Sequence, residues 1–199
     1  MDTSVVKAIA KWPDVPDVYG WLGLSLRGNW KIKGKSIANS GICEFICRNY
    51  CSDTNGRWFF QNGPQRVFVS LDYAPFVLQT TGTRDGYLVT HTGSRLDRIS
   101  GVWIDEMGTV VVRWPTGVGS ICDRDLSEVA EWMTNSEGTP ITDETLVKVL
   151  ETPAPHGSAG FWLGYRSQRL PVGRVLSTIA PSKFAFERTP QPAPGQPDC

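Results

Sequence analysis

The sequence lacks any apolar run long enough to cross a membrane. A spanning helix needs about 20 predominantly apolar residues in succession, and no stretch of the 199 residues provides them. The first sixteen residues also lack a basic region followed by an extended apolar core, which a secretory signal requires. We therefore expect a cytoplasmic protein with no membrane partner.

An excess of charge of one sign is missing as well. The chain has 20 basic and 20 acidic residues, so its formal net charge is zero. Long nucleic acids are bound through many cationic contacts, and we expect no such partner. A small anionic or nucleotide-like ligand needs only one or two cations and remains compatible with the composition, as does an oligomer.

Motifs for catalysis and cofactor binding are also absent. The chain contains only two histidines, His91 and His156, and no HExxH, CxxC or nucleophile-elbow sequence. GNWKIKGKS has five residues between its glycines where a P-loop has four, and GVGSIC lacks the third glycine of a dinucleotide fingerprint. We expect no cofactor and no metal site, and the motifs assign no reaction.

Three cysteines, Cys43, Cys47 and Cys51, are spaced four apart on a predicted helix over 41–51. Neighbours at this spacing have Cβ atoms about 6 Å apart, so three thiols stacked along a helix cannot converge on one metal ion. We expect them to be reduced, metal-free core residues in a reducing compartment.

Glycine and proline are plentiful, with 20 and 14 residues, which favours short strands and many turns. The apolar pattern predicts an α+β fold of two repeated, mostly antiparallel sheet-plus-helix units. Helices are expected at 4–11, 41–51, 123–133 and 143–151, a glycine-rich loop at 115–120, and strands at 19–26, 30–33, 58–61, 65–71, 77–81, 87–91, 95–105, 109–114, 161–165, 170–176 and 183–187.

A long-period internal similarity suggests a duplication. Residues 28–56 and 108–138 each begin and end with glycine and each predict a strand, a loop and a helix. Further matches join Gly56 and Trp58 to Gly160 and Trp162, Gln65-Arg66 to Gln168-Arg169, and Ala74-Pro75 to Ala180-Pro181. Chance similarity between two such modules is the alternative interpretation.

The domain boundaries that we expect follow from this pattern. Residues 1–18 form an N-terminal arm, 19–82 a first α+β unit and 83–188 a second. Residues 189–199 contain four prolines and little that could be buried, so they are predicted to be a disordered tail.

Polar residues gather at three places that could hold a ligand. Each also has a structural explanation, namely a solvated turn, a histidine at a strand end and a helix cap. The members are Gln61, Asn62, Gln65 and Arg66; Arg84, Thr90 and His91; and Asp123, Arg124 and Asp125.

Arg66 and His91 are expected to line a cleft between the two halves. Arg66 shares a strand face with Phe68, and a guanidinium beside an aromatic ring suits a planar anionic ligand. The alternative is that Arg66 pairs with an acidic residue across the sheet.

The motifs GNWKIKGKSI, NGRWFF, QRVFV and YAPFVL, in this order around a helix, resemble a family of uncharacterised proteobacterial proteins. The resemblance covers roughly residues 19–151. It implies a duplicated α+β core with a second half superficially like a pleckstrin-homology fold. It also implies a nucleotide-like ligand between the halves and a role in signalling, but no established activity.

Together these observations predict a non-enzymatic protein that binds a small ligand or acts in regulation. One alternative is a hydrolase that uses His91 with Asp123 or Asp125, and another is a protein-interaction module that uses tryptophan-rich strands. The predicted ligand-binding residues are Gln61, Asn62, Gln65, Arg66, Arg84, His91, Asp123 and Arg124.

Overall fold

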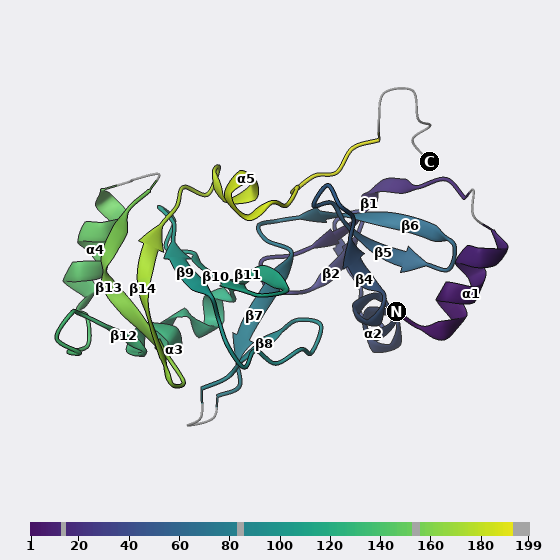
Figure 1. Ribbon diagram of the computed structural model, residues 1–199. Coiled ribbons are helices and arrows are strands. Elements are labelled where there is room, and N and C mark those ends of the chain that lie inside the picture. The colour runs from purple at the N-terminus through teal and green to yellow at the C-terminus, as the bar shows by residue number, and fades with distance from the viewer. Residues whose placement is uncertain (13–14, 83–85, 153–155, 193–199) are drawn as a thin grey trace. The chain divides into compact units, whose positions relative to one another are not determined.

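The computed structural model (Figure 1) describes residues 1–12, 15–82, 86–152 and 156–192. The chain divides into two compact units, the first formed by Met1–Pro75 with Ala185–Cys199 and the second by Phe76–Phe184. Each unit contains a mostly antiparallel sheet with helices, so the α+β class is confirmed. None of the described helices is long and apolar enough to span a membrane.

The first unit has a six-stranded sheet in the order β3-β2-β1-β6-β5-β4. β1 and β6, at its centre, are parallel, and every other neighbouring pair is antiparallel. The elements are α1 (Thr3–Lys11), β1 (Val18–Leu24), β2 (Trp30–Ile32), β3 (Lys35–Ser36), α2 (Ser40–Arg48), β4 (Tyr50–Ser52), β5 (Trp58–Asn62) and β6 (Gln65–Leu71).

The second unit has an eight-stranded sheet in the order β12-β13-β14-β9-β10-β11-β7-β8. Its elements are β7 (Phe76–Thr80), β8 (Leu88–Thr90), β9 (Gly101–Ile104), β10 (Val110–Trp114), β11 (Gly117–Ile121), the 3-10 helix η1 (Asp123–Asp125), α3 (Leu126–Glu131), β12 (Met133–Thr134), α4 (Asp143–Glu151), β13 (Ser158–Tyr165), β14 (Gln168–Arg174) and α5 (Ala180–Phe184).

The two sheets contain the same six-stranded arrangement. Strands β1 to β6 of the first sheet correspond, in chain order, to β9 to β14 of the second. With this correspondence the order of the first sheet becomes β11-β10-β9-β14-β13-β12, and these six strands are neighbours in the same order in the second sheet. The parallel pair β1–β6 has its counterpart in β9–β14. The predicted duplication is confirmed in topology, and the second unit adds the β7–β8 hairpin next to β11 and α4 between β12 and β13.

The same turn recurs at equivalent places in the two repeats. A side-chain oxygen accepts hydrogen bonds from the backbone N–H groups two and four residues later, in turns that begin at Ser25, Asp53, Asp105 and Asn135. The fourth residue of each turn has a positive φ, which favours glycine. These residues are Gly28, Gly56, Gly108 and Gly138, the four that delimit the repeats in the sequence.

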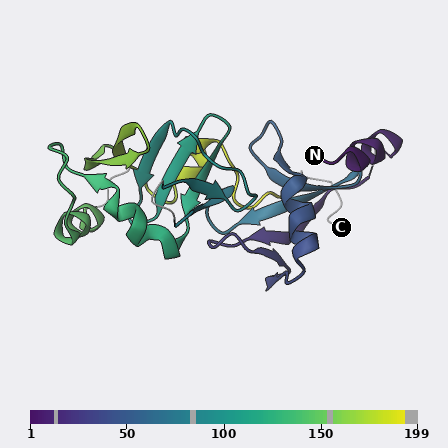
Figure 2. The same cartoon turned by 90° about the horizontal axis from the view of Figure 1, so that it is seen from below.

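In the first unit, α2 lies against one face of the sheet (Figure 2). Asn39 caps this helix through a 3.0 Å hydrogen bond from the N–H of Ile42 to its Oδ1, as expected for an N-cap asparagine. Phe45 of α2 meets Phe60 of β5 edge-on, with ring centroids 5.4 Å apart. Pairs of this kind stabilise a fold beyond the area that they bury.

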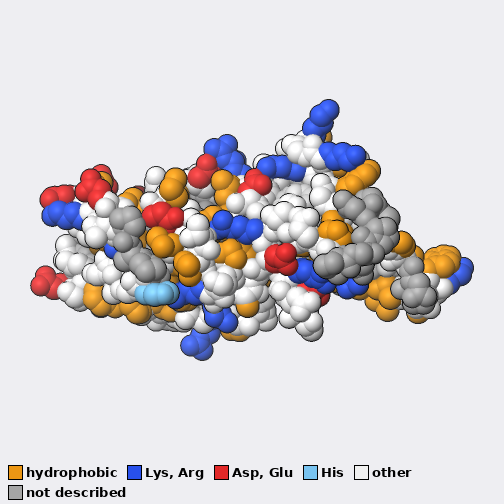
Figure 3. Space-filling model, turned by 90° about the horizontal axis from the view of Figure 1, so that it is seen from above, with side chains coloured by type: hydrophobic (Ala, Val, Ile, Leu, Met, Phe, Trp, Pro, Cys, Tyr) orange, Lys and Arg blue, Asp and Glu red, His pale blue; other side chains and the backbone are white. Residues whose placement is uncertain are grey.

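A buried cluster forms the core of the second unit. Leu78 and Leu88 come from the β7–β8 hairpin, and the central strands β9, β10, β13 and β14 supply residues that include Val102, Val112, Leu163 and Val172. All of these side chains are essentially inaccessible to water. On the molecular face shown in Figure 3, acidic and basic side chains are interspersed, in keeping with the formal charge of zero.

Several predicted elements were wrong. Residues 117–121 form β11 rather than part of a glycine-rich loop, and Gly119 is needed there because a Cβ would lie 2.7 Å from the carbonyl oxygen of Phe76 on β7. The strand expected at 183–187 is absent: α5 ends at Phe184, and Ala185 has a positive φ of 57°, which interrupts an extended chain. Cys51 lies on β4 and not on the preceding helix.

Parts of the predicted sequence matches also need correction. Ala74-Pro75 connects β6 to β7, whereas Ala180-Pro181 begins α5, so these pairs are not equivalent. Gln65 and Gln168 do begin equivalent strands, each paired with the last residue of the preceding strand. Phe59 and Trp162 each lie six residues before these glutamines. Trp162 is therefore equivalent to Phe59 and not to Trp58.

The unit boundaries differ from those expected. The first unit ends at Pro75 rather than at residue 82, because β7 pairs with β11 of the second sheet. Ala185 begins the part of the chain that returns to the first unit, where the N–H of Leu71 donates to the carbonyl oxygen of Arg188. Most of the predicted disordered tail, residues 193–199, lies outside the described residues.

Candidate functional site

The polar residues around the β5–β6 turn mostly hold neighbouring chain segments in place. Gln61 is buried and its Nε2 donates to the carbonyl oxygen of Gly63 at 2.9 Å. Gln65 Nε2 donates to the carbonyl oxygen of Pro16 at 3.1 Å, and Arg66 Nε lies 3.0 Å from the Asp17 carboxylate. The acidic partner that was the alternative for Arg66 is therefore present, and it neutralises the guanidinium.

The second repeat explains why a glutamine begins β6. Gln168, at the equivalent place on β14, donates from Nε2 to the carbonyl oxygen of Ile99 at 3.0 Å and accepts from its N–H at 3.0 Å. Ile99 precedes β9, and Pro16 precedes β1. At both places the glutamine fixes the segment that enters the first strand of the repeat, which is a structural role.

His91 lies in the second unit at the end of β8. Its Nδ1 accepts a hydrogen bond from the backbone N–H of Val77 at 3.3 Å, and the backbone N–H of His91 donates to the carbonyl oxygen of Val77 at 2.7 Å. Burial lowers the pKa of the imidazole to about 3. The ring is therefore neutral near pH 7 and supplies no positive charge to an anion.

The remaining predicted site residues lie elsewhere in the second unit. Asp125 Oδ2 accepts from the N–H of Thr80 at 3.1 Å and so ties η1 to β7. Asp123 begins η1 instead of capping an α-helix, and Arg124 beside it is exposed. Arg84 lies outside the described residues.

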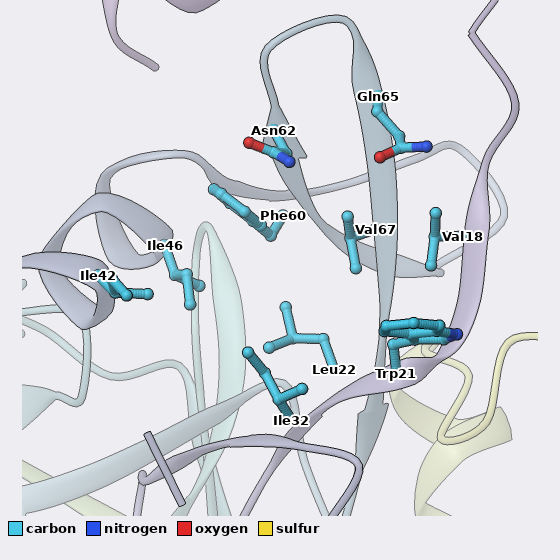
Figure 4. A pocket seen from close by; sticks show the side chains of 10 residues that line it. All are labelled: Val18, Trp21, Leu22, Ile32, Ile42, Ile46, Phe60, Asn62, Gln65 and Val67. Carbon is cyan, nitrogen blue, oxygen red and sulfur yellow. The ribbon is translucent and has the colours of Figure 1, made fainter. Parts of the chain in front are cut away.

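The structure reveals a groove in the first unit that the sequence did not predict. It has a volume of about 390 Å³ and lies between α2 and the sheet (Figure 4). Of the residues that line it, only Asn62 and Gln65 belonged to the predicted site. The lining residues are Val18, Trp21, Leu22, Ile32, Ile42, Ile46, Phe60, Asn62, Gln65 and Val67.

The groove is apolar along its length and polar at one end. Ile42 and Ile46 approach from α2, and the carboxamides of Asn62 and Gln65 lie together near the β5–β6 turn (Figure 4). None of its lining residues carries a charge. Pockets with apolar walls and a few polar groups are typical of ligand sites, where the polar groups fix orientation.

Large apolar side chains of the groove are exposed to solvent. Trp21 and Ile32 are each 46% exposed and Ile42 is 47% exposed. Lys33 extends over the Trp21 ring, with Nζ 3.7 Å from its centroid. Contiguous exposed apolar surface of this kind marks binding sites on folded proteins.

The cysteines lie outside the groove. Cys43 and Cys47 lie on α2 and Cys51 on β4, and the indole Nε1 of Trp30 donates to Cys47 Sγ at 3.3 Å. Burial raises the pKa of the Cys47 and Cys51 thiols. Across the described residues, no three His, Cys, Asp or Glu side chains are grouped so that they could hold a metal ion.

The topology defines a duplicated α+β protein, and its first unit has an apolar groove. The chain belongs to a family described as a protein of unknown function (DUF2946), whose sequence model, named DUF2944, matches residues 1–191. The predicted membership of an uncharacterised family is thus confirmed. No curated protein matches the chain.

Two crystal structures of DUF1285 family proteins are similar to this chain. The protein from Silicibacter pomeroyi DSS-3 has 14% sequence identity and a TM-score of 0.51, covering 86% of this chain and 94% of its own. At this identity the likeness shows a shared fold alone. The protein from Shewanella baltica OS155 has 12% identity and a TM-score of 0.41, covering 54% of this chain and 87% of its own.

Proposed function

We propose that this protein is a non-enzymatic binding protein with a regulatory role, and that the groove of the first unit is its ligand site. The observation that carries the proposal is the groove itself, with its apolar walls, its two terminal carboxamides and three half-exposed apolar side chains. A folded domain keeps such surface open when it has a ligand to cover it.

The groove favours a neutral, largely apolar ligand over the anionic ligand expected from the sequence. A phosphate or carboxylate would need a cation or several N–H donors in the site. The groove lining contains no cation, and Lys33, which is not a lining residue, lies over the Trp21 ring. Arg66 is paired with Asp17, and His91 is neutral near pH 7. A nucleotide-like ligand therefore has less support than an apolar group whose polar end meets Asn62 and Gln65.

The hydrolase alternative gains little support from the surroundings of His91. A general base works best when its pKa is close to the working pH, whereas the pKa of this imidazole is about 3. Its Nδ1 accepts from a backbone N–H, and Asp125 accepts from another. Both groups hold β7 in position.

The proposal can be tested with Nile red, a neutral apolar dye whose fluorescence rises on binding. Ile42→Lys places a charge in the groove and should weaken dye binding by about tenfold or more, or about 1.4 kcal/mol. Val147→Lys is the matched control, because Val147 is 48% exposed on a helix of the second unit and does not line the groove. Equal affinity of both variants for the dye would overturn the proposal.

A further inference from the structure

The duplication makes it possible to compare the groove with its counterpart in the second unit. In the first unit, Leu22 of β1 is paired with Ile32 of β2 and Val69 of β6. In the second unit, Val102 of β9 is paired in the same way with Val112 of β10 and Val172 of β14. Several groove residues therefore have counterparts in the core of the second unit. The pairs include Leu22 with Val102, Ile32 with Val112, and Phe60 with Leu163.

Burial differs strongly at one of these three pairs. Leu22 and Val102 are 4% and 1% exposed. Ile32 is 46% exposed, whereas Val112 is completely buried. The first unit therefore lacks something that covers this position in the second.

The second unit shows what covers the position there. β7 lies parallel to β11, with Leu78 opposite Ile121, and the N–H of Cys122 donates to the carbonyl oxygen of Leu78 at 2.8 Å. Leu78 is completely buried in the same cluster as Val112. A strand added to the edge of the repeat thus contributes to its core, together with α4, which also packs against this cluster.

In the first unit the equivalent edge is open. The registers Lys31↔Ser36 and Val111↔Ser120 make β3 the counterpart of β11, and β3 is the last strand of its sheet in the described part of the chain. The N–H of Ile37 donates to the carbonyl oxygen of Trp30. Because antiparallel residues alternate in the direction of their hydrogen bonds, the N–H and C=O of Ser36 point away from β2.

We propose that the natural occupant of the groove is an extended apolar segment of a partner protein. It pairs in parallel alongside β3, as β7 pairs with β11. It places an apolar residue in the row of Ile32 and Lys35, as β7 places Phe76 in the row of Val112 and Gly119. Main-chain pairing supplies affinity and the side-chain pocket supplies specificity in this mode of recognition. The inference rests on the proposed function, since it names the class of ligand for the same groove.

Lys35 is the residue that opposes such pairing. It stands at the position of Gly119, where a Cβ would lie 2.7 Å from the Phe76 carbonyl oxygen of the added strand. Lysine on an edge strand prevents indiscriminate strand pairing. We therefore expect Lys35 to keep the edge selective, and Lys35→Gly to tighten binding of any strand that follows the path of β7.

The experiment uses the full chain with labelled isoleucine methyl groups and a synthetic peptide of residues 74–82, APFVLQTTG, which contains the β7 sequence. Titration should shift the methyl resonances of Ile32, Ile37 and Ile42 and leave that of the buried Ile104 unchanged. A control peptide with serine in place of the valine and leucine should produce no shift. Lys35→Gly should tighten binding of the natural peptide several-fold.

The outcomes separate this inference from the proposed function. If Nile red binds the groove but the peptide shifts none of the three methyl groups, the strand proposal is wrong and the ligand site stands. If Lys35→Gly leaves the peptide affinity unchanged, pairing along β3 is wrong. Shifts of the same methyl groups on raising the protein concentration alone would identify a second copy of the chain as the occupant and overturn the proposal.

Discussion

Ile32 and Val112 occupy the same position in the two repeats, but Ile32 is 46% exposed and Val112 is completely buried. Each is paired across its sheet with an equivalent buried residue, Leu22 or Val102. The second unit carries two additional elements, the β7–β8 hairpin, whose leucines enter its core, and α4, whose apolar residues pack against it. One repeat is therefore closed by its own chain, and the other keeps an open groove.

This difference in burial predicts a difference in stability. Val112→Ser leaves a cavity and buries a hydroxyl, and should lower the free energy of unfolding by about 2–4 kcal/mol. Ile32→Ser removes a half-exposed side chain and should cost less than about 1 kcal/mol. Urea denaturation of the two variants measures both values, and equal losses would show that Ile32 is covered in solution.

The sequence predicted the repeat because turns have local signatures. Gly28, Gly56, Gly108 and Gly138 delimit matching spans, and each is required by a left-handed turn. The strand β11 was missed because its glycines suggested a loop, whereas Gly119 is there to let β7 approach closely. Only the neighbouring strand, which is distant in the sequence, reveals that need.

The groove could not be predicted in the same way. Ile42 lies on α2 and is apolar, which is typical of a core position, yet it is 47% exposed. Arg66 was chosen for its charge, but Asp17, 49 positions earlier, neutralises it. Exposure and pairing both depend on tertiary neighbours.

Gly56 should tolerate substitution less well than its counterpart Gly138. Both have positive φ, so alanine costs about 1–2 kcal/mol at either position. A Cβ at Gly56 would also overlap the carbonyl oxygen of Ala185, whereas nothing lies within 4 Å of one at Gly138. We expect Gly56→Ala to destabilise the protein by about 1–3 kcal/mol more than Gly138→Ala, measured by urea denaturation. Equal effects would contradict the observed contact with residue 185.

His91 should make stability depend on pH in the mildly acidic range. Its pKa is lowered by burial from 6.5 to about 3, so below pH 6.5 the unfolded chain binds a proton that the folded chain does not. Stability is complete above this pH and falls as the pH drops, by up to about 1.4 kcal/mol per pH unit. His91→Gln should flatten the profile between about pH 6.5 and 4.5, whereas the control His156→Gln, at an exposed residue, should not. An unchanged profile in His91→Gln would refute the assignment.

The partly buried thiols of Cys47 and Cys51 should react slowly in the folded protein. Burial raises the pKa of Cys47 and Cys51, and only the thiolate is nucleophilic. Alkylation by iodoacetamide at neutral pH, followed by mass spectrometry, should be at least about tenfold slower at these residues than in urea. Equal rates would show that the packing around α2 and β4 is open, and stoichiometric zinc in the purified protein would contradict the metal-free state that we expect.

The position of a bound apolar probe tests the central claim most directly. With isoleucine methyl groups labelled, nuclear Overhauser contacts from bound Nile red should reach Ile32, Ile42 and Ile46, which line the groove from β2 and α2. Binding with contacts only to isoleucines of the second unit, such as Ile121 or Ile141, would show that the groove of the first unit is not the ligand site.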